Sequence, residues 1–478
     1  METTKTEKAL SDKWKGSGTL KRSLKWVYVY SLATGAIFTF MGYWDGVFLS
    51  SCGPATWLAF LMMTFMIMPI AYVYCELAAV MPFTGAELRY ATVGLNKHAG
   101  FWSCWLIMLA WIAVPPAGVM GVLDWLNFTT NAGISDQTIT LIGCGCLVAF
   151  CFMSMYKIEI AGSVQTFMLF AAMIGCIITV VVLFLGDRLD FANLTPHFRS
   201  GFESKYGPFW GWMVGLSIII TPYFGFEVVP NLVEEGNFPI KSLSKAIWGS
   251  AVSAGVIYIF FYFFTSNVAP WETLTNNGDF SGFVILKQMV TWSTGWKRYA
   301  LFFGITCILF PIATSVLGFW ISSVRLLYAM GRHNFLPKAF AKTNRHSEPI
   351  LPNLLVLAIG IAFLLNKNST FVADFFILMA LGCATTYLII MVSAIRLALN
   401  YPEWERPFKI PGGMGMRVLA LIIAGIITFG CTFSLNWGAM RVLTIYLGLG
   451  AIIWLWAIFV IWPKNKVWMQ TPDGEKDF

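Results

Sequence analysis

The chain has 478 residues, of which 58% are hydrophobic and 12% are charged, and its mean hydropathy is +0.70. Soluble globular proteins carry about 25% charged residues, so this composition excludes that class and predicts a protein that crosses a membrane many times. The net charge of +8 lies mainly on loops between apolar runs and does not indicate a nucleic-acid partner.

Twelve apolar stretches of helical length follow one another along the chain. They run approximately over residues 26–51, 54–80, 98–126, 137–155, 159–186, 209–235, 243–269, 299–329, 350–366, 370–398, 415–436 and 439–462. We therefore predict an all-α membrane protein with about twelve transmembrane helices. It would have a single transmembrane domain at residues 26–462, between an N-terminal tail (1–25) and a C-terminal tail (463–478).

Lysine and arginine residues divide unequally between the two sides of this arrangement. Most of the 32 fall on the side that holds both chain ends, in the two tails and in the loops near residues 330–346 and 396–417. Positively charged loops stay preferentially in the cytoplasm. We therefore expect a multi-pass protein of the cytoplasmic (plasma) membrane with both termini in the cytoplasm.

The first span contains the stretch GAIFTFMGYWDG at residues 35–46, in which Gly42 is followed within one turn by two aromatic residues and Asp45. Span six repeats the combination of glycine, aromatic residues and an acid in FGFE, residues 224–227. The two stretches lie five spans apart, and an odd number of spans per repeat makes the two halves inverted in the membrane. Interrupted helices at matching positions of such halves mark transporter binding sites.

Span six also carries Pro222, Gly225, Glu227 and Pro230 in its middle. An interior proline costs a helix roughly 3 kcal/mol and frees a backbone carbonyl group. A carboxylate near the middle of a membrane costs at least about 2.5 kcal/mol on insertion scales. These features predict a broken helix that lines a cavity, with a continuous kinked helix and a paired Glu227 as the alternative.

Polar side chains in spans two and eight have two interpretations. Glu76 and Glu87 are interpreted as acids that pair with the nearby Arg89 rather than as substrate ligands. Hydroxyl groups in span eight are candidates for a sodium site, although such groups more often bond to their own helix. The sodium candidates are Thr314, Ser315, Ser322 and Ser323.

No pattern in the chain indicates metal or cofactor chemistry. The four histidines fall at span ends or in loops without the spacing of metal ligands, and the ten cysteines include no CxxC pair. We find no nucleophile–base arrangement either. We therefore expect no metal, no cofactor and no enzymatic activity, and membrane lipid and a small-molecule substrate as the partners.

Four stretches together resemble the amino acid–polyamine–organocation (APC) family of transporters. They are FGFEVVPNLVEE at residues 224–235, ELAAVMPFTGAELRY at 76–90, RLLYAMGRHNFLPK at 325–338 and RPFKIPGG at 406–413. The resemblance implies a leucine-transporter-type fold. In that fold spans one to five and six to ten form a 5+5 inverted repeat, and helices one and six are broken around the substrate.

The resemblance also implies a binding site. The free amides of an unwound segment near Thr39–Gly42 would bind the anionic or polar end of the substrate. The segment Thr221–Phe224 would shape the pocket for its side chain. The full set of substrate-binding candidates is Thr39, Phe40, Met41, Gly42, Tyr43, Trp44, Asp45, Thr221, Pro222, Tyr223 and Phe224.

The chain departs from the family pattern at two places. Many amino-acid transporters of the family carry a Gly-Ser-Gly-type run in span one, whereas this chain has a glycine–aromatic–Trp cluster with a nearby acid. That cluster is similar to the ethanolamine-permease-like branch. Some members also carry a lysine in span five that stands in for sodium, and the matching place here is Ala172.

These features predict a secondary active transporter of a small amino acid that works by alternating access, coupled to protons or acting as an exchanger. A proton is favoured over sodium as the coupling ion, and Glu227 is its candidate carrier, the alternative being a permanently hydrogen-bonded structural acid. Asp45 is a candidate for attracting an ammonium group, or else a solvated acid at the wall of the vestibule. The alternative functions are a permease for ethanolamine or another small amine, and a membrane nutrient sensor that does not transport.

Overall fold

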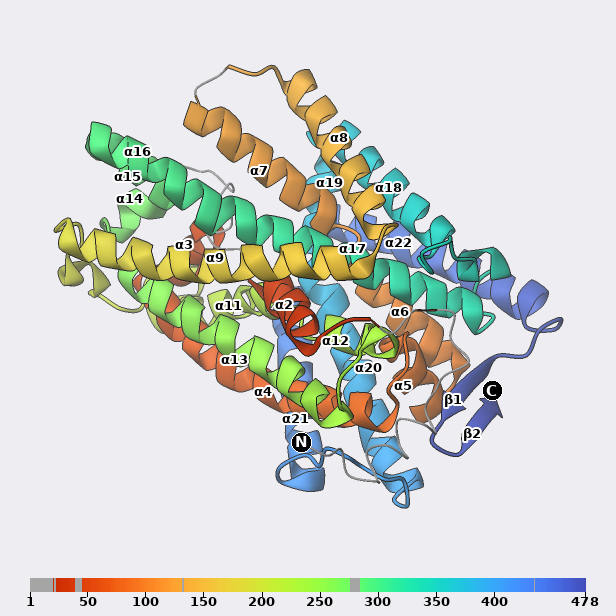
Figure 1. Ribbon diagram of the computed structural model, residues 1–478. Helices are drawn as coiled ribbons and strands as arrows, with labels where there is room; N and C mark the ends of the chain where they lie inside the picture. Colours follow the sequence, from red (N-terminus) through yellow and green to blue (C-terminus); the bar gives the residue numbers. More distant parts are fainter. Residues whose placement is uncertain (1–19, 21–22, 39–44, 131–132, 276–283, 434) are drawn as a thin grey trace.

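The computed structural model describes residue 20 and residues 23–38, 45–130, 133–275, 284–433 and 435–478. Figure 1 shows a bundle of long, crossing helices with a small β-hairpin at one end, which we call the tail end. The longer helices are α2 (Trp26–Ile37), α3 (Asp45–Cys52), α4 (Thr56–Val80), α5 (Ala86–Gly94), α6 (Lys97–Trp111), α7 (Val114–Thr130), α8 (Asp136–Ser154), α9 (Ile158–Leu185), α11 (Pro208–Leu216), α13 (Ile240–Thr265), α15 (Val284–Trp292), α16 (Thr294–Phe303), α17 (Phe310–Arg332), α18 (Ile350–Leu365), α19 (Thr370–Ile377), α20 (Met379–Asn400), α21 (Gly413–Thr432) and α22 (Trp437–Trp456). The shorter helical pieces are η1 (Gly53–Ala55), η2 (Phe191–Leu194), α10 (Glu203–Tyr206), η3 (Ile218–Tyr223), α12 (Val228–Asn231), η4 (Val233–Glu235), α14 (Trp271–Thr275), η5 (Gly304–Leu309), η6 (Lys338–Ala341) and η7 (Ala457–Ile461).

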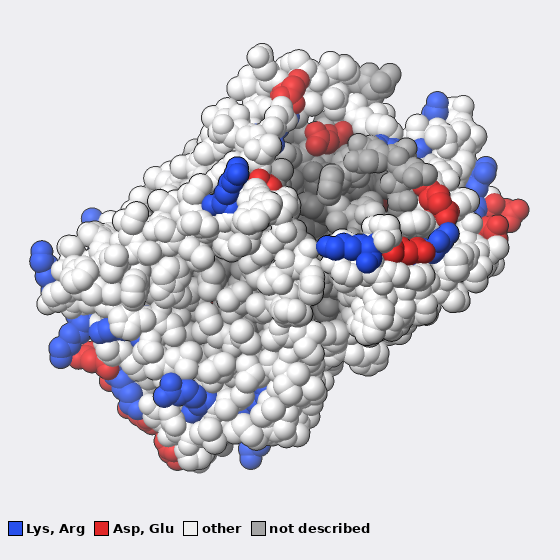
Figure 2. All heavy atoms as spheres, turned by 180° about the vertical axis from the view of Figure 1, so that it is seen from behind, with Lys and Arg blue, Asp and Glu red and all other residues white. Residues whose placement is uncertain are grey.

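Ten helical stretches of the described residues are long and apolar enough to cross a membrane, and α2 and α18 are shorter apolar helices. The prediction of an all-α membrane protein is therefore confirmed. The last two spans leave large apolar side chains such as Phe429 and Ile452 exposed, as expected for helices that face lipid. Figure 2 shows broad areas of the surface without charged side chains, and a hollow bordered by both acidic and basic ones.

The helix α2 lies at the centre of the bundle, where it contacts α9, α12, α13 and α17. Around this centre α4 packs along α13, and α20 packs against α6 and α21. The second half of span six, α12, therefore meets α2 in the interior of the protein, whereas the first half, α11, packs against α3.

Span six is broken, as predicted, and is not a continuous kinked helix. The helix α11 ends at Leu216 and is followed by the 3₁₀ turn η3, in which Pro222 cannot donate a backbone hydrogen bond. Phe224 is extended, with φ −67° and ψ 135°, and Gly225 has a φ of +139°. Because L-residues rarely adopt that φ, glycine at this position allows the chain to turn before α12 begins at Val228.

Gly225→Ala is expected to lower both stability and transport. A Cβ atom at this position would lie 2.7 Å from the backbone nitrogen of Ile37 and 2.8 Å from the Cβ of Ala36. The strained backbone alone costs about 1–3 kcal/mol, and the contact pushes α2 away from the break. The apparent melting temperature of the purified variant measures the effect, with Gly448→Ala, where a Cβ would meet nothing within 4 Å, as the control. Equal melting temperatures for the two variants would contradict the role assigned to Gly225.

The C-terminal residues form an antiparallel hairpin of β1 (Trp468–Thr471) and β2 (Gly474–Asp477), which the sequence analysis did not predict. The turn between them reads Thr-Pro-Asp-Gly, a typical turn sequence. The guanidinium group of Arg89 donates a hydrogen bond of 2.8 Å to the carbonyl oxygen of Gln470, and Nδ1 of His333 lies 2.8 Å from the carbonyl oxygen of Trp468. The hairpin therefore joins α5 to the end of α17.

Candidate substrate and proton site

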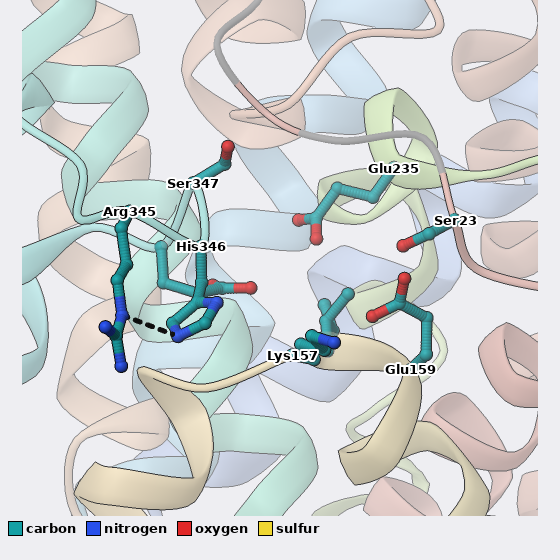
Figure 3. A pocket seen from close by; sticks show the side chains of 9 residues that line it. Ser23, Lys157, Glu159, Glu235, Arg345, His346 and Ser347 are labelled. Carbon is teal, nitrogen blue, oxygen red and sulfur yellow. Dashed lines mark hydrogen bonds between the residues drawn. The ribbon is translucent and has the colours of Figure 1, made fainter.

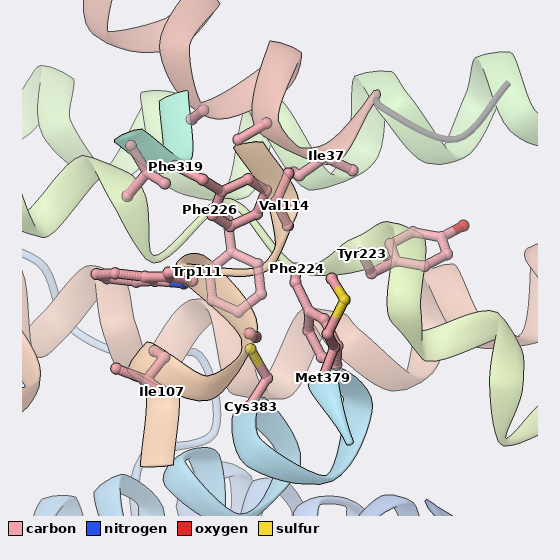
Figure 4. Close-up of a cluster of buried hydrophobic side chains, with 14 of the residues drawn as sticks. Ile37, Ile107, Trp111, Val114, Tyr223, Phe224, Phe226, Phe319, Met379 and Cys383 are labelled. Carbon is pink, nitrogen blue, oxygen red and sulfur yellow. The ribbon is translucent and has the colours of Figure 1, made fainter. Parts of the chain in front are cut away.

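At the break in span six, apolar side chains from several elements meet in one buried cluster (Figure 4). Phe224 and Phe226 enter it from the break itself. Its other labelled members are Ile37 at the end of α2, Ile107 and Trp111 of α6, Val114 of α7, Phe319 of α17, and Met379 and Cys383 of α20. A solute that binds at this break would therefore meet mainly apolar and aromatic walls.

The carboxylate of Glu227 lies directly beside this cluster and is completely buried. Its Oε2 accepts hydrogen bonds from the backbone nitrogen of Gly225 at 2.8 Å and from the hydroxyl group of Tyr387 at 2.9 Å. Its Oε1 accepts a hydrogen bond of 3.3 Å from Nε1 of Trp111. The acid thus joins span six to α6 and α20, and none of these three partners is a cation.

The side chains of the predicted pocket segment in span six point in two different directions. Phe224 points into the apolar cluster and packs edge-on against Tyr387, with ring centroids 5.9 Å apart. Tyr223 points away from the cluster, because its hydroxyl group lies 2.6 Å from Oγ1 of Thr64 and donates to the carbonyl oxygen of Phe60 at 2.9 Å. Thr221 and Pro222 precede it in η3. Of these predicted residues, Phe224 lies in the cluster, whereas Tyr223 connects span six to α4 through its hydrogen bonds.

Of the predicted site residues in span one, the structure describes only Asp45. Thr39, Phe40, Met41, Gly42, Tyr43 and Trp44, and with them the predicted break of span one, lie outside the described residues. Asp45 begins α3 and accepts a hydrogen bond of 2.9 Å from the backbone nitrogen of Gly46. Its side chain is completely buried, so the interpretation of Asp45 as a solvated acid is wrong. Asp45 lies on α3, which packs beside the first half of span six, whereas Glu227 follows the break.

The four hydroxyl groups proposed for sodium do not form one site. Ser315 donates to the carbonyl oxygen of Ala36 at 3.2 Å and so fastens α17 to α2. The hydroxyl group of Thr314 bonds within its own helix, to the carbonyl oxygen of Pro311 at 2.7 Å, and lies 3.3 Å from the carbonyl oxygen of Gly35. Ser322 and Ser323 lie eight residues further along, which is about 12 Å at the rise of an α-helix. Within the described residues, no group of three or more His, Cys, Asp or Glu side chains is placed to hold a metal ion.

A residue that the sequence analysis missed, Gln165 of α9, lies at the same junction. Its Nε2 donates hydrogen bonds to the carbonyl oxygens of Ser31 at 3.2 Å and Thr314 at 2.9 Å. Span five thus contributes the neutral amide of Gln165 to the junction between α2 and α17. Ala172, the position matched from the family resemblance, lies about two turns further along α9 and has no polar side chain.

The tail end of the bundle is closed by buried ion pairs. Arg325 of α17 donates to Glu235 at 2.8 Å and to Glu348 at 2.6 Å, and all three side chains are buried. The carbonyl oxygen of Glu235 also accepts the backbone nitrogens of Ser23 and Leu24, each at 2.9 Å. The segment before α2, the end of span six and the end of α17 are therefore held together.

A cavity of about 250 Å³ adjoins these ion pairs (Figure 3). Both acidic and basic side chains border it, and Nε of Arg345 lies 3.2 Å from Nε2 of His346. The lining residues are Ser23, Lys157, Ile158, Glu159, Glu235, Arg345, His346, Ser347 and Glu348. This cavity differs from the apolar cluster at the break because charged side chains line it and because it lies at the tail end.

The predicted pairing of Glu76 and Glu87 with Arg89 is wrong. Glu76 of α4 forms ion pairs with Arg406, in the loop before α21, and, at 2.6 Å, with Arg417 of α21 itself. Glu87 accepts a hydrogen bond from Asn231, and Arg89 bonds to the hairpin instead. Sequence proximity to Arg89 was misleading, because successive residues of a helix point in different directions.

A membrane helix that is broken inside the protein is typical of multi-pass transporters, which bind small solutes at such breaks. Residues 24–462 match the family of amino acid permeases, and the chain belongs to that family. It is a transporter of the APC type and not an enzyme.

Several relatives align with most of the chain at low identity. A probable threonine/serine transporter, YbxG, of Bacillus subtilis (strain 168) is 23% identical over 433 residues, 87% of this chain and 90% of the relative. A methylthioribose transporter of the same organism is 23% identical over 79% of this chain and 80% of its own length. A D-serine/D-alanine/glycine transporter of Escherichia coli O6:H1 is 24% identical over 69% of each chain. These three names cover chemically different solutes.

Proposed function

We propose that this protein is a secondary active transporter that carries a small amino acid across the plasma membrane by alternating access. The proposal rests mainly on the buried carboxylate of Glu227 at the break of span six. This carboxylate accepts hydrogen bonds from side chains of α6 and α20, and an apolar cluster borders it. A helix break at membrane depth persists where its freed backbone groups meet protein or a bound solute. The names of the relatives for serine, threonine, alanine and glycine support a small substrate.

The transport cycle follows from this assignment. Spans one to five and six to ten form the two inverted halves, and both chain ends lie in the cytoplasm. The tail end is then the cytoplasmic side, and the pairs of Arg325 with Glu235 and Glu348 are part of its closure. Release of substrate into the cytoplasm requires the end of span six to move away from α17, which separates these pairs.

A proton is the coupling ion that the contacts favour. Glu227 has only neutral partners among its hydrogen-bond donors and can take up a proton without breaking an ion pair. Sodium would need the carbonyl oxygens at the junction of α2, α9 and α17. Three of these already accept hydrogen bonds, those of Ser31 and Thr314 from Gln165 and that of Ala36 from Ser315.

An amine without a carboxylate is the second candidate substrate, and buried Asp45 favours it. In the amino-acid case the proposed partner of the carboxylate is the segment Thr39–Gly42, which lies outside the described residues. In the amine case Asp45 binds the ammonium group. A thermal-shift screen of the purified protein separates the two, because a ligand that binds only the folded state raises the melting temperature. Stabilisation by small α-amino acids supports the proposal, and stabilisation by ethanolamine-like amines alone overturns it.

Asp45→Asn is expected to leave the affinity for small amino acids within about threefold, since a change of less than 1 kcal/mol corresponds to a group that does not contact the ligand. The measurement is the concentration of ligand that gives half-maximal thermal stabilisation. A tenfold or larger loss for an amine, with no loss for an amino acid, would transfer the ammonium-binding role to Asp45.

A further inference from the structure

A line of polar groups leads from Glu227 towards the tail end. Nδ2 of Asn231 donates to the carbonyl oxygen of Glu227 at 3.2 Å and to Oε2 of Glu87 at 3.0 Å. Oδ1 of Asn231 accepts hydrogen bonds from the backbone nitrogens of Gly85 at 3.2 Å and Ala86 at 3.1 Å. These two donors fix the orientation of the amide, so its NH₂ group must face Glu87.

Glu87 is completely buried and has no cation among its partners in the described part of the chain. The guanidinium group of Arg89 is turned away, towards Gln470, Thr84 and His333. The titratable groups that act on Glu87 or feel its charge come from several of the elements around it. They are Tyr74 of α4, Tyr90 of α5, Cys104 of α6, Glu227 of span six and Cys383 of α20. Burial raises the pKa of Glu87, which lies in the helix between spans two and three, to about 8.

The two acids differ in how well their oxygens are bonded. Glu227 accepts three hydrogen bonds through its two oxygens. Glu87 accepts one at Oε2, and its Oε1 has no hydrogen-bond partner within the described residues. Hydrogen bonds to an ionised carboxylate stabilise the charge, whereas burial without them favours the protonated form. In this conformation Glu227 is therefore the better bonded site for the negative charge, and Glu87 is the better site for the proton.

The surroundings of Glu87 offer further groups that can exchange protons. The hydroxyl groups of Tyr74 and Tyr90 are buried and, like Oε1 of Glu87, have no hydrogen-bond partner among the described residues. The ring of Tyr74 lies between those of Tyr90 and Tyr387, with centroids 6.3 and 5.8 Å away. Tyr387 in turn bonds to Glu227. The rings of Tyr90, Tyr74 and Tyr387 are therefore in contact one after another, and the last of them bonds to Glu227.

We propose that Glu87 is the second proton-binding residue of the transport cycle and shares one negative charge with Glu227. When α6 and α20 move relative to span six and Glu227 loses its bonds to Trp111 and Tyr387, the O–H bond at Glu87 breaks and one forms at Glu227. The charge passes to Glu87, which keeps the amide of Asn231 as its donor. This inference rests on the proposed transport function and adds a proton site at the tail end of the membrane domain.

Infrared spectroscopy of the purified protein tests the protonation directly. At pH 7 the wild type is expected to show the carbonyl stretch of protonated carboxyl groups, and Glu87→Gln is expected to lose the contribution of Glu87 to this signal. Glu403→Gln, which changes an exposed acid, keeps the signal. A signal that persists unchanged in Glu87→Gln overturns the proposal. If Glu87→Gln does not fold, Glu87→Asp keeps a carboxyl group, and its signal must titrate at a different pH from that of the wild type.

Transport in liposomes supplies the second measurement. Glu87→Gln is expected to keep substrate exchange within about threefold and to lose at least tenfold in accumulation driven by a pH gradient, because it cannot take up the proton. Accumulation equal to that of the wild type contradicts the inference. A wild type that accumulates no substrate contradicts the proposed function instead, and the infrared result still decides whether Glu87 holds a proton.

The stability of the protein gives a third readout with a defined sign. Between pH 4.5, the ordinary pKa of a glutamate, and pH 8, folded Glu87 holds a proton that the unfolded chain has lost. Its contribution to stability is therefore full below pH 4.5 and falls as the pH rises towards 8. The melting temperature of the wild type should fall more steeply than that of Glu87→Gln across this range, and parallel curves would contradict the assignment.

Discussion

Glu227→Gln is expected to abolish substrate accumulation driven by a pH gradient while the protein still folds. Glutamine keeps the shape of the side chain but takes up no proton. Its amide nitrogen also replaces one carboxylate oxygen, so at least one of the donors Trp111, Gly225 and Tyr387 is left without an acceptor. A buried donor without its partner costs about 1–3 kcal/mol, which leaves a protein of ordinary stability folded.

The measurement is uptake into liposomes under an imposed pH gradient, compared with exchange of labelled for unlabelled substrate without a gradient. Tyr387→Phe is the matched control, because it removes one hydrogen bond to Glu227 and leaves the proton-binding group in place. A hydrogen bond to a charged group contributes roughly 1.5–3 kcal/mol, so we expect this control to be slowed but still coupled. Undiminished pH-driven uptake by Glu227→Gln would show that Glu227 carries no proton.

Arg325→Met is expected to be the most destabilising single change at the tail end. The substitution leaves the buried carboxylates of Glu235 and Glu348 without their cation. Breaking a buried ion pair by removing one partner costs about 3–5 kcal/mol, because the remaining charge stays in a medium that solvates it poorly. A loss of this size is expected to lower the apparent melting temperature and the yield of folded protein.

An exposed ion pair provides the control for this prediction. Lys466 and Asp477 form a pair of 3.0 Å in which the side chains are 81% and 58% exposed. Such pairs contribute about 0–1 kcal/mol, so Lys466→Met is expected to leave the melting temperature almost unchanged. Similar melting temperatures for the two variants would mean that Arg325 does not hold the end of span six in place.

The features that follow from the hydrophobic pattern and from helix-breaking residues could be predicted from the sequence. The apolar stretches marked the membrane helices, because a span needs about 20 apolar residues whatever its neighbours are. Pro222 and Gly225 marked the break in span six, because a missing N–H group and a positive φ act locally. Glu227 was identified as important because a carboxylate in a membrane span is costly wherever it lies.

The partners of Glu227 could not be predicted in the same way. Trp111 and Tyr387 are single residues in spans three and ten, and nothing in their local sequence shows that they face an acid in span six. Gln165 was missed for the same reason, although a lone amide in the apolar run of span five was a usable signal. The different directions of Tyr223 and Phe224 depend on Thr64 in α4, which only the packing reveals.

The C-terminal hairpin shows a different limit. Its turn sequence, Thr471-Pro-Asp-Gly474, is visible in the chain, but each of its strands has only four residues and an isolated hairpin of that size is marginally stable in water. Its stability depends on contacts with Arg89 and His333, which lie far away in sequence. Contacts with residues that are distant in sequence, rather than the local sequence pattern, therefore decide whether such a short segment folds.

The most direct test of the central proposal is the accumulation of labelled serine, threonine, alanine or glycine by liposomes that contain the purified wild-type protein. With an inward proton gradient, at least one of these amino acids should reach a higher concentration inside than outside. The accumulation should collapse when a protonophore removes the gradient. Saturable binding of an amino acid in a thermal-shift assay without any accumulation would contradict the proposal and indicate a membrane sensor instead.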